Sequence, residues 1–343
     1  MNWITILKRG RFAALLLFAV AASGEACPRG ADLFQRRNWI EAAKAFEDCE
    51  NANPGSTDAL LYRGKALINV SDFAAAGAPL EAYIAAHPQS DDSLYLLGYV
   101  RFRQGHPRES LELFARAAKL KAPQAGDLKI AALDYALLDD YTSAARYLEQ
   151  SLQLAPNDIE ARYHLGRVRY QRQQFEAAIA AFTEVLKRDP NNVKAEENLG
   201  LCLEAKNRIS DAITAYRKAI ELDSASVVRF EQPYLDLGKL LTTLDRPAEA
   251  VPVLKQAISI QPKSASAHYE LGRAQLALRH LDDARLQLEE AAQLDPVNGS
   301  LHYLLGRIYK RLGKTEDAAK EFKRTEELVQ QHNSQSGGMA SGR

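Results

Sequence analysis

The sequence predicts an all-α solenoid of antiparallel helix hairpins, and three observations predict it. Small, alanine-like and bulky residues each recur every 34 residues along almost the whole chain. Each 34-residue stretch contains two apolar patterns with the three- and four-residue spacing of amphipathic helices. Prolines follow the second pattern in six of the stretches. A period of this length is typical of repeats that bury their apolar faces only by stacking on their neighbours.

Three series of residues carry the period, with steps of 34 residues and one step of 38. The first series is Gly30, Gly64, Gly98, Ala132, Gly166, Gly200, Gly238, Gly272 and Gly306. The second is Ala42, Ala76, Ser110, Ala144, Ala178, Ala212, Ala250, Ala284 and Ala318. The third is Phe46, Leu80, Phe114, Leu148, Phe182, Tyr216, Leu254, Leu288 and Phe322. We interpret the small series as the points where the helices of a hairpin meet, and the bulky series as filling the space towards the next hairpin.

Nine copies follow from these series, with four extra residues between the sixth and seventh. Their approximate ranges are 23–56, 57–90, 91–124, 125–158, 159–192, 193–226, 231–264, 265–298 and 299–332. The repeat region therefore covers residues 25–332. The insertion lies in the stretch 224–233, which is a lengthened connection or a hinge between two blocks of repeats. Residues 333–343 are rich in Ser, Gly and Gln, which predicts a disordered tail.

The spacing within each copy resembles the tetratricopeptide repeat. Copies such as Tyr163-His164-Leu165-Gly166 through Asp189-Pro190, and Tyr269-Glu270-Leu271-Gly272 through Asp295-Pro296, carry the consensus residues in order. The copies depart from it at Ala132, which replaces Gly, and at Ser224, which replaces Pro. The resemblance implies a right-handed superhelix whose concave groove is lined chiefly by the first helix of each hairpin and holds a partner protein.

The N-terminus has the pattern of a secretory signal peptide over residues 1–24. Three basic residues precede the eleven-residue apolar run Phe12–Ala22, and small residues follow it. Cleavage is expected after Gly24, with Ala22 and Ala26 as alternatives. The run is too short for a membrane anchor, which needs about 20 apolar residues. Lipidation of Cys27 is disfavoured, because Glu25 stands where a lipoprotein signal has a small residue. We expect an exported, periplasmic protein with no membrane span in its mature form.

The composition excludes several function classes. Lys and Arg number 44, as do Asp and Glu, and 46% of the residues are hydrophobic. These values fit a globular protein and not a nucleic-acid-binding one, which would carry a basic excess. Residues 1–24 hold three of the bases and none of the acids, so residues 25–343 have a formal charge of −3. The seven His residues are dispersed, and no metal, cofactor or catalytic motif emerges. We therefore expect no enzyme and no bound cofactor.

Aromatic and basic residues coincide on the groove-facing side of several first helices. A Tyr four residues before an Arg recurs in three copies, which places both side chains on one helix face. The candidate groove residues are Tyr95, Tyr99, Phe102, Tyr163, Arg167, Tyr170, Tyr269, Arg273, Tyr303, Arg307 and Lys310. Tyr offers contact area and Arg offers planar donors for carboxylates. Alternatively, the Tyr rings pack within the superhelix and the Arg side chains are solvated.

The three cysteines divide into an expected pair and a single thiol. Cys27 and Cys49 lie near opposite ends of the first copy, and antiparallel helices bring such positions together. Export permits their oxidation. We predict a disulfide, worth roughly 3 kcal/mol in the chain-entropy model. Cys202 is expected to remain free and buried.

These features favour an exported, non-enzymatic scaffold or adaptor that binds partner proteins or extended peptides, for example during envelope assembly. The alternative is a scaffold that binds or guides an anionic polysaccharide, since Tyr and Arg also suit acidic sugars. An enzyme would instead need perturbed His or carboxylate groups clustered in one pocket.

Overall fold

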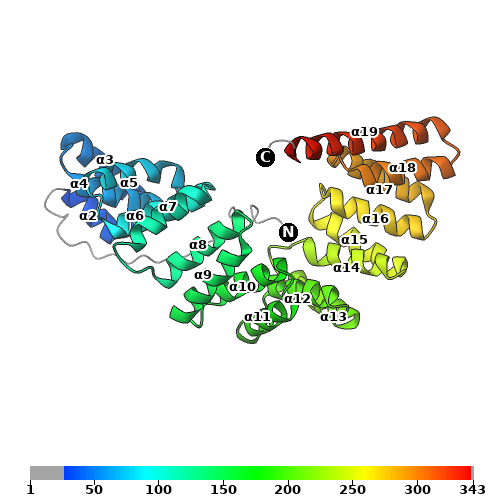
Figure 1. The fold of residues 1–343 in the computed structure, drawn as a ribbon, viewed down its shortest axis with the longest axis horizontal. Coiled ribbons are helices and arrows are strands. Elements are labelled where there is room, and N and C mark those ends of the chain that lie inside the picture. The colour runs from blue at the N-terminus through cyan, green and yellow to red at the C-terminus, as the bar shows by residue number, and fades with distance from the viewer. Residues whose placement is uncertain (1–26, 341–343) are drawn as a thin grey trace. The chain divides into compact units, whose positions relative to one another are not determined.

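The computed structural model describes residues 27–340, which form eighteen helices and no strand (Figure 1). The prediction of an all-α fold built from consecutive helix pairs is therefore confirmed. The predicted signal peptide, residues 1–24, lies outside the described residues. No helix within the described part of the chain has both the length and the apolar character needed to cross a membrane.

The chain divides into two compact units between Ala181 and Phe182. This boundary falls inside a helix, α11 (Phe175–Arg188), and not at the stretch 224–233 that the sequence marked as a candidate hinge. The other helices of the first unit are α2 (Pro28–Gln35), α3 (Trp39–Ala52), α4 (Thr57–Asn69), α5 (Phe73–Ala86), α6 (Asp91–Gln104), α7 (Pro107–Ala118), α8 (Ala125–Leu137), α9 (Tyr141–Leu154) and α10 (Ile159–Gln171).

The second unit contains the remaining eight helices. They are α12 (Val193–Ala205), α13 (Ile209–Ser224), α14 (Gln232–Thr243), α15 (Pro247–Ile260), α16 (Ala265–Ala277), α17 (Leu281–Leu294), α18 (Gly299–Arg311) and α19 (Thr315–Ala340). α19 extends as far as Ala340 and so includes most of the residues from Asn333 onwards for which the sequence predicts a disordered tail. Extending an existing helix adds one hydrogen bond per residue without a new nucleation step.

The two helices of a hairpin pack with a glycine of the first against a bulky side chain of the second. A Cβ added to Gly64 would lie 2.6 Å from Cγ of Leu80, and one added to Gly200 would lie 2.6 Å from Cε1 of Tyr216. The bulky series therefore covers the small residue of its own hairpin. Our interpretation that it fills the space towards the next hairpin was wrong, because the 16-residue offset between the two series places them face to face in one repeat.

Each turn between the helices of a hairpin contains one residue in the left-handed conformation. These residues are Arg37, Ser71, Gly105, Asp139, Gln173, Asn207, Asp245, Arg279 and Gly313, with φ between 57° and 81°. Only two of them are glycines. The left-handed conformation therefore recurs at the same position of each hairpin whichever residue stands there.

The four-residue insertion forms the connection between α13 and α14. The buried carboxylate of Asp223 accepts a hydrogen bond from the backbone N–H of Phe230 at 2.7 Å. The guanidinium of Arg229 lies 3.5 Å from the same carboxylate and donates to the hydroxyl of Tyr234 at 2.6 Å. Asp223 thus fastens the far end of the connection to the end of α13.

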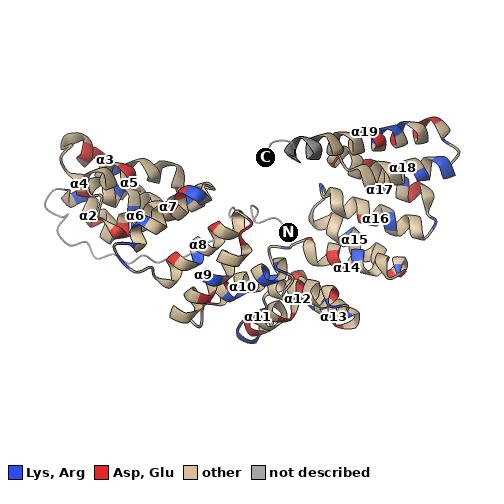
Figure 2. Cartoon of the chain, viewed as in Figure 1, with Lys and Arg blue, Asp and Glu red and all other residues tan. Residues whose placement is uncertain are grey.

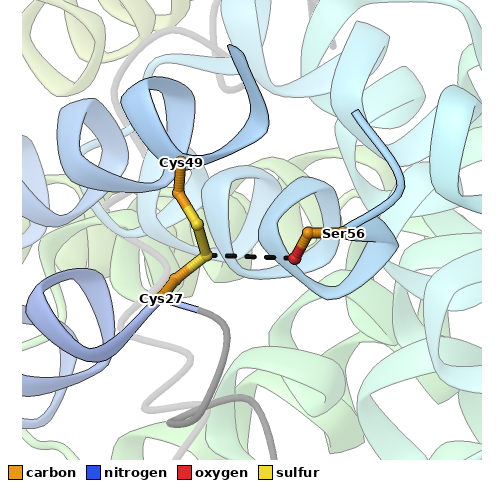
Figure 3. Close-up of a disulfide and its surroundings, with 3 residues drawn as sticks. All are labelled: Cys27, Cys49 and Ser56. Atoms are coloured by element: carbon orange, nitrogen blue, oxygen red, sulfur yellow. Dashed lines mark hydrogen bonds between the residues drawn. A yellow bond between two sulfur atoms is a disulfide. The ribbon is translucent and has the colours of Figure 1, made fainter. Parts of the chain in front are cut away.

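Cys27 and Cys49 are joined by a disulfide, with their Cα atoms 6.0 Å apart (Figure 3). Cys27 precedes α2 and Cys49 lies in α3, and the Ser56 hydroxyl is 3.9 Å from the Cys27 sulfur. Cys202 is free and buried, as expected, and burial raises the pKa of its thiol to about 12. The thiol therefore stays protonated and unreactive near neutral pH.

Candidate functional site

A pocket of about 820 Å³ lies in the second unit between α16, α18 and α19. It is lined by Tyr269, Arg273, Val297, Gly299, Ser300, Tyr303, Leu304, Thr325, Leu328, Val329 and Asn333. Three of these residues, Tyr269, Arg273 and Tyr303, are among the predicted groove residues. The structure thus brings together candidate residues from the eighth and ninth copies.

Local contacts fix the helices that form the pocket. The side chain of Ser264 accepts a hydrogen bond from the Ala267 N–H at the start of α16, and Asn298 accepts one from Leu301 at the start of α18, both at 3.2 Å. Such caps satisfy backbone donors that the first helical turn leaves unpaired. The ring of His302 joins α18 to α19, because its Nδ1 lies 2.6 Å from a carboxylate oxygen of Glu321. These contacts fix the starts of α16 and α18 and hold α18 against α19.

The rim of the pocket exposes large apolar and aromatic side chains. Val297 retains 68% of its surface, Val329 52% and Tyr303 48%. Leu328 is buried beneath them. Exposed apolar groups that converge on one hollow are typical of a binding site, because a bound group would remove them from water.

The Tyr and Arg residues of the recurring pattern stack on one another. The guanidinium carbon of Arg273 lies 5.9 Å from the ring centroid of Tyr269. That of Arg307 lies 5.8 Å from the ring centroid of Tyr303. Cation–π contacts of this kind hold an arginine in place without neutralising its charge. Arg273 also donates to the carboxylate of Glu270 at 2.7 Å. Burial raises the pKa of Glu270, while the charge of Arg273 opposes the rise.

Arg307 and Lys310 lie outside the pocket lining, further along α18 from Tyr303. Both side chains are exposed. They share a helix face with Tyr303, since the three residues are four and three positions apart. Figure 2 shows Lys and Arg at this end of α18.

In the first unit, three residues that the sequence predicts to be accessible in the groove are buried, so the prediction is wrong for them. Phe102 retains 1% of its surface and belongs to a hydrophobic core that also contains Leu97 and Leu133. Tyr99 is buried in the same core, and Arg167 retains 1% of its surface. Neighbouring helices cover these positions, which helix periodicity within a single copy does not reveal.

The other candidates of the first unit are half-buried. The hydroxyl of Tyr95 donates to the carbonyl of Lys121 at 2.8 Å, which ties α6 to the connection before α8. The ring of Tyr163 lies 5.5 Å from that of His164, and the ring of Tyr170 lies 5.5 Å from that of Phe175. These contacts match the alternative interpretation, in which the tyrosines pack within the repeats.

Several pocket residues escaped the sequence analysis. The repeat pattern predicts groove residues only on first helices, whereas Thr325, Leu328 and Val329 come from the second helix of the ninth copy. The available signal was the apolar pair Leu328 and Val329 in an otherwise charged helix. Within residues 27–340, no group of three or more His, Cys, Asp or Glu side chains is arranged to hold a metal ion.

Comparisons with known proteins agree with the repeat architecture. A family model described as tetratricopeptide repeat matches residues 27–91, 163–227, 235–296 and 269–333, and a second model with the same description matches residues 136–180. None of the curated proteins matches the chain.

Among solved structures, a tetratricopeptide repeat protein from Parabacteroides merdae is 18% identical, with a TM-score of 0.59, and the match covers 78% of this chain and 98% of that one. The C-terminal part of a TPR repeat-containing protein from Cytophaga hutchinsonii is 17% identical, with a TM-score of 0.57 and coverage of 71% and 98%. At these identities the likeness shows the fold alone. A structure of MamA is 28% identical over 50% of this chain and 97% of that one, with a TM-score of 0.45.

Proposed function

Since this chain belongs to the tetratricopeptide repeat family, whose fold serves protein–protein interaction, we propose that it is an exported, non-enzymatic adaptor that binds an extended segment of a partner protein in the pocket between α16, α18 and α19. The observation that carries the proposal is the pocket itself. It has room for several side chains and exposes Val297, Tyr303 and Val329 around its rim.

The composition of the pocket suits a peptide. Tyr269 and Tyr303 offer ring faces and hydroxyl groups, Leu304 and Leu328 offer apolar contact, and Arg273 offers planar donors. Aromatic and arginine side chains often contribute most of the binding free energy at protein interfaces. No specific contact favours an anionic polysaccharide, which becomes an alternative outcome of the experiment below.

A library of random twelve-residue peptides, displayed on phage, is selected on the purified protein, and the best peptide is then titrated by fluorescence anisotropy. We expect the double variant Tyr303→Ala/Val329→Ala to weaken binding at least tenfold. The matched control is Leu286→Ala/Val227→Ala, which removes exposed apolar side chains of the same unit outside the pocket. The control should bind within twofold of the original protein.

Two results contradict this proposal. The first is a selection that enriches no peptide while the anionic polysaccharide alginate binds. The second is an equal loss of peptide binding in both double variants, which would place the binding site elsewhere. Circular dichroism of each variant checks that its helices and melting temperature are retained.

Export is supported by two independent features. The first is the basic and apolar pattern of residues 1–24. The second is the Cys27–Cys49 disulfide, a bond that persists mainly in oxidising compartments. Fusing residues 1–30 to alkaline phosphatase, which is active only after export, should produce enzyme activity. Replacing Lys8, Arg9 and Arg11 by Glu should abolish it, and retained activity would contradict a signal peptide.

A further inference from the structure

We infer that the partner segment carries acidic residues next to its apolar ones, and that these bind a basic stripe on α18 formed by Arg307, Lys310 and Arg311. The inference rests on the proposed function, because the stripe begins beside Tyr303, which lines the pocket. It narrows the ligand from any extended segment to one with an apolar anchor and carboxylates at a defined separation.

The stripe follows one face of α18 away from the pocket. Arg307 stacks on Tyr303, which lines the pocket, and Lys310 and Arg311 follow three and four residues later. All three basic side chains are exposed. Residues at these spacings lie on the same side of a helix.

The stripe has no acidic residue beside it within α18. No Asp or Glu occurs between residues 299 and 315. Within residues 27–340, Arg307, Lys310 and Arg311 take part in none of the ion pairs of the structure. The contact between Arg307 and Tyr303 is a stacking contact with the ring. Some bases on other hairpins of this unit are neutralised locally, as Arg208 is by Asp211 and Arg246 by Glu249, both at 2.7 Å.

The helix dipole explains only part of this arrangement. A cation in the last turn of a helix is stabilising, which accounts for Lys310 and Arg311. Arg307 lies before that turn, stacked on Tyr303, which lines the pocket. The row of cations runs from beside an apolar pocket to the end of the helix. It is therefore complementary to a peptide that has an apolar part next to an acidic part.

The geometry sets the spacing within the ligand. Tyr303 and Lys310 are seven residues apart, which corresponds to roughly 10 Å along the helix axis. An extended peptide spans that distance in about three or four residues. An anionic membrane would call for a broad basic face, whereas these cations form a single line beside a pocket. We therefore expect acidic residues three or four positions from the apolar anchor.

The experiment selects the same displayed library on two further proteins. One is the stripe variant Arg307→Gln/Lys310→Gln/Arg311→Gln. The other is the control variant Lys255→Gln/Lys263→Gln, which removes exposed bases of the same unit away from α18. The original protein and the control should enrich peptides with an apolar cluster and Asp or Glu three or four positions away. The stripe variant should keep the apolar cluster and lose the acidic excess.

Titrations then quantify the effect. A peptide enriched by the original protein should bind the stripe variant at least tenfold more weakly, and the difference should shrink between 50 and 300 mM salt, because screening weakens exposed charge pairs. The Tyr303→Ala/Val329→Ala variant should weaken the same peptide, which links the two parts of the site.

The outcomes separate this inference from the proposed function. Apolar peptides without an acidic excess, bound equally by the original protein and the stripe variant, would overturn the stripe and leave the pocket standing. Failure to enrich any peptide would overturn both. Binding of phosphatidylglycerol vesicles that depends on the stripe, with no acidic excess in the peptides, would also overturn the inference.

Discussion

Asp134 of α8 is a carboxyl group without exposed surface in the core of the first unit. Neither of its oxygens makes a hydrogen bond of ordinary geometry within the described residues. Burial raises the pKa of Asp134 to about 8, and the nearby Ser110 hydroxyl offsets only part of the rise. The folded protein therefore keeps Asp134 protonated at neutral pH, whereas an unfolded Asp ionises near pH 4.

This difference predicts how stability depends on pH. Because the folded state holds the proton and the unfolded state releases it, the contribution of Asp134 to the free energy of unfolding falls as pH rises from about 4 to about 8. The slope approaches about 1.4 kcal/mol per pH unit for one proton. Asp134→Asn should abolish it and raise the urea midpoint at pH 7, but not at pH 4. The exposed Asp283→Asn is the control, and an equal change there would contradict the assignment to Asp134.

Burial also decided which candidate site residues the sequence could identify. Arg167, Arg273 and Arg307 all follow a Tyr at a spacing of four, and all three stack on that ring. The spacing therefore predicted the stacking partner. It did not predict exposure, because Arg167 is buried while Arg307 is exposed. Exposure depends on the helices packed alongside, which belong to other copies.

At the scale of single elements, the hairpin turns place ordinary residues in a conformation that favours glycine. Arg279 has φ of 63° and Asn207 has φ of 57°. For most side chains this left-handed region costs roughly 1–2 kcal/mol, but Asn tolerates it through its short polar side chain. The helices on either side hold the turn in this shape despite its cost.

Replacing the turn residues by glycine should therefore stabilise the protein to different extents. We expect Arg279→Gly to raise the free energy of unfolding by about 1 kcal/mol, since glycine adopts a positive φ freely. Asn207→Gly should change it by no more than a few tenths of a kcal/mol. Urea denaturation monitored by circular dichroism measures both. If the two variants gain equally, the side chain at the turn does not determine the strain.

The helices themselves were predictable because the 34-residue period repeats the same signals in many copies. The end of α19 was not, because a run of Ser, Gln and Gly resembles a disordered tail and only its continuity with a formed helix makes it helical. The pocket shows the same limit. Its first-helix residues followed from periodicity, while Leu328 and Val329 lie on the second helix of the ninth copy, where the repeat pattern predicts no groove residue.

At the scale of the whole molecule, stability is shared among neighbouring repeats. Helices pack mainly on helices one or two places away along the chain, such as α4 with α3 and α5. In such an array the folded state is approximately a sum of repeat and nearest-neighbour contributions. A local defect should therefore unfold part of the array and leave distant repeats folded.

Gly64→Val tests this expectation, because its Cβ would approach Leu80 to 2.6 Å. Overpacking of this kind costs about 1–3 kcal/mol. Amide hydrogen exchange should accelerate in α4 and α5, while α8 and α9 keep their protection. Gly126→Ala is the matched control, since a Cβ there meets nothing within 4 Å. Equal acceleration in all four helices would mean that the first unit unfolds as one cooperative body.

The disulfide of the first hairpin has a mechanical consequence. When the chain is stretched from its two ends, tension passes directly from Cys27 to Cys49 through the sulfur atoms, and the segment between them bears no load. The two cysteines are 22 residues apart, so roughly 75 Å of extensible length is withheld from the pulling force. Forced extension can therefore neither unravel α2 nor peel the first part of α3 from its N-terminal side. The oxidised molecule is shorter at full extension than the reduced one, and its first hairpin could pass a narrow pore only as a doubled strand.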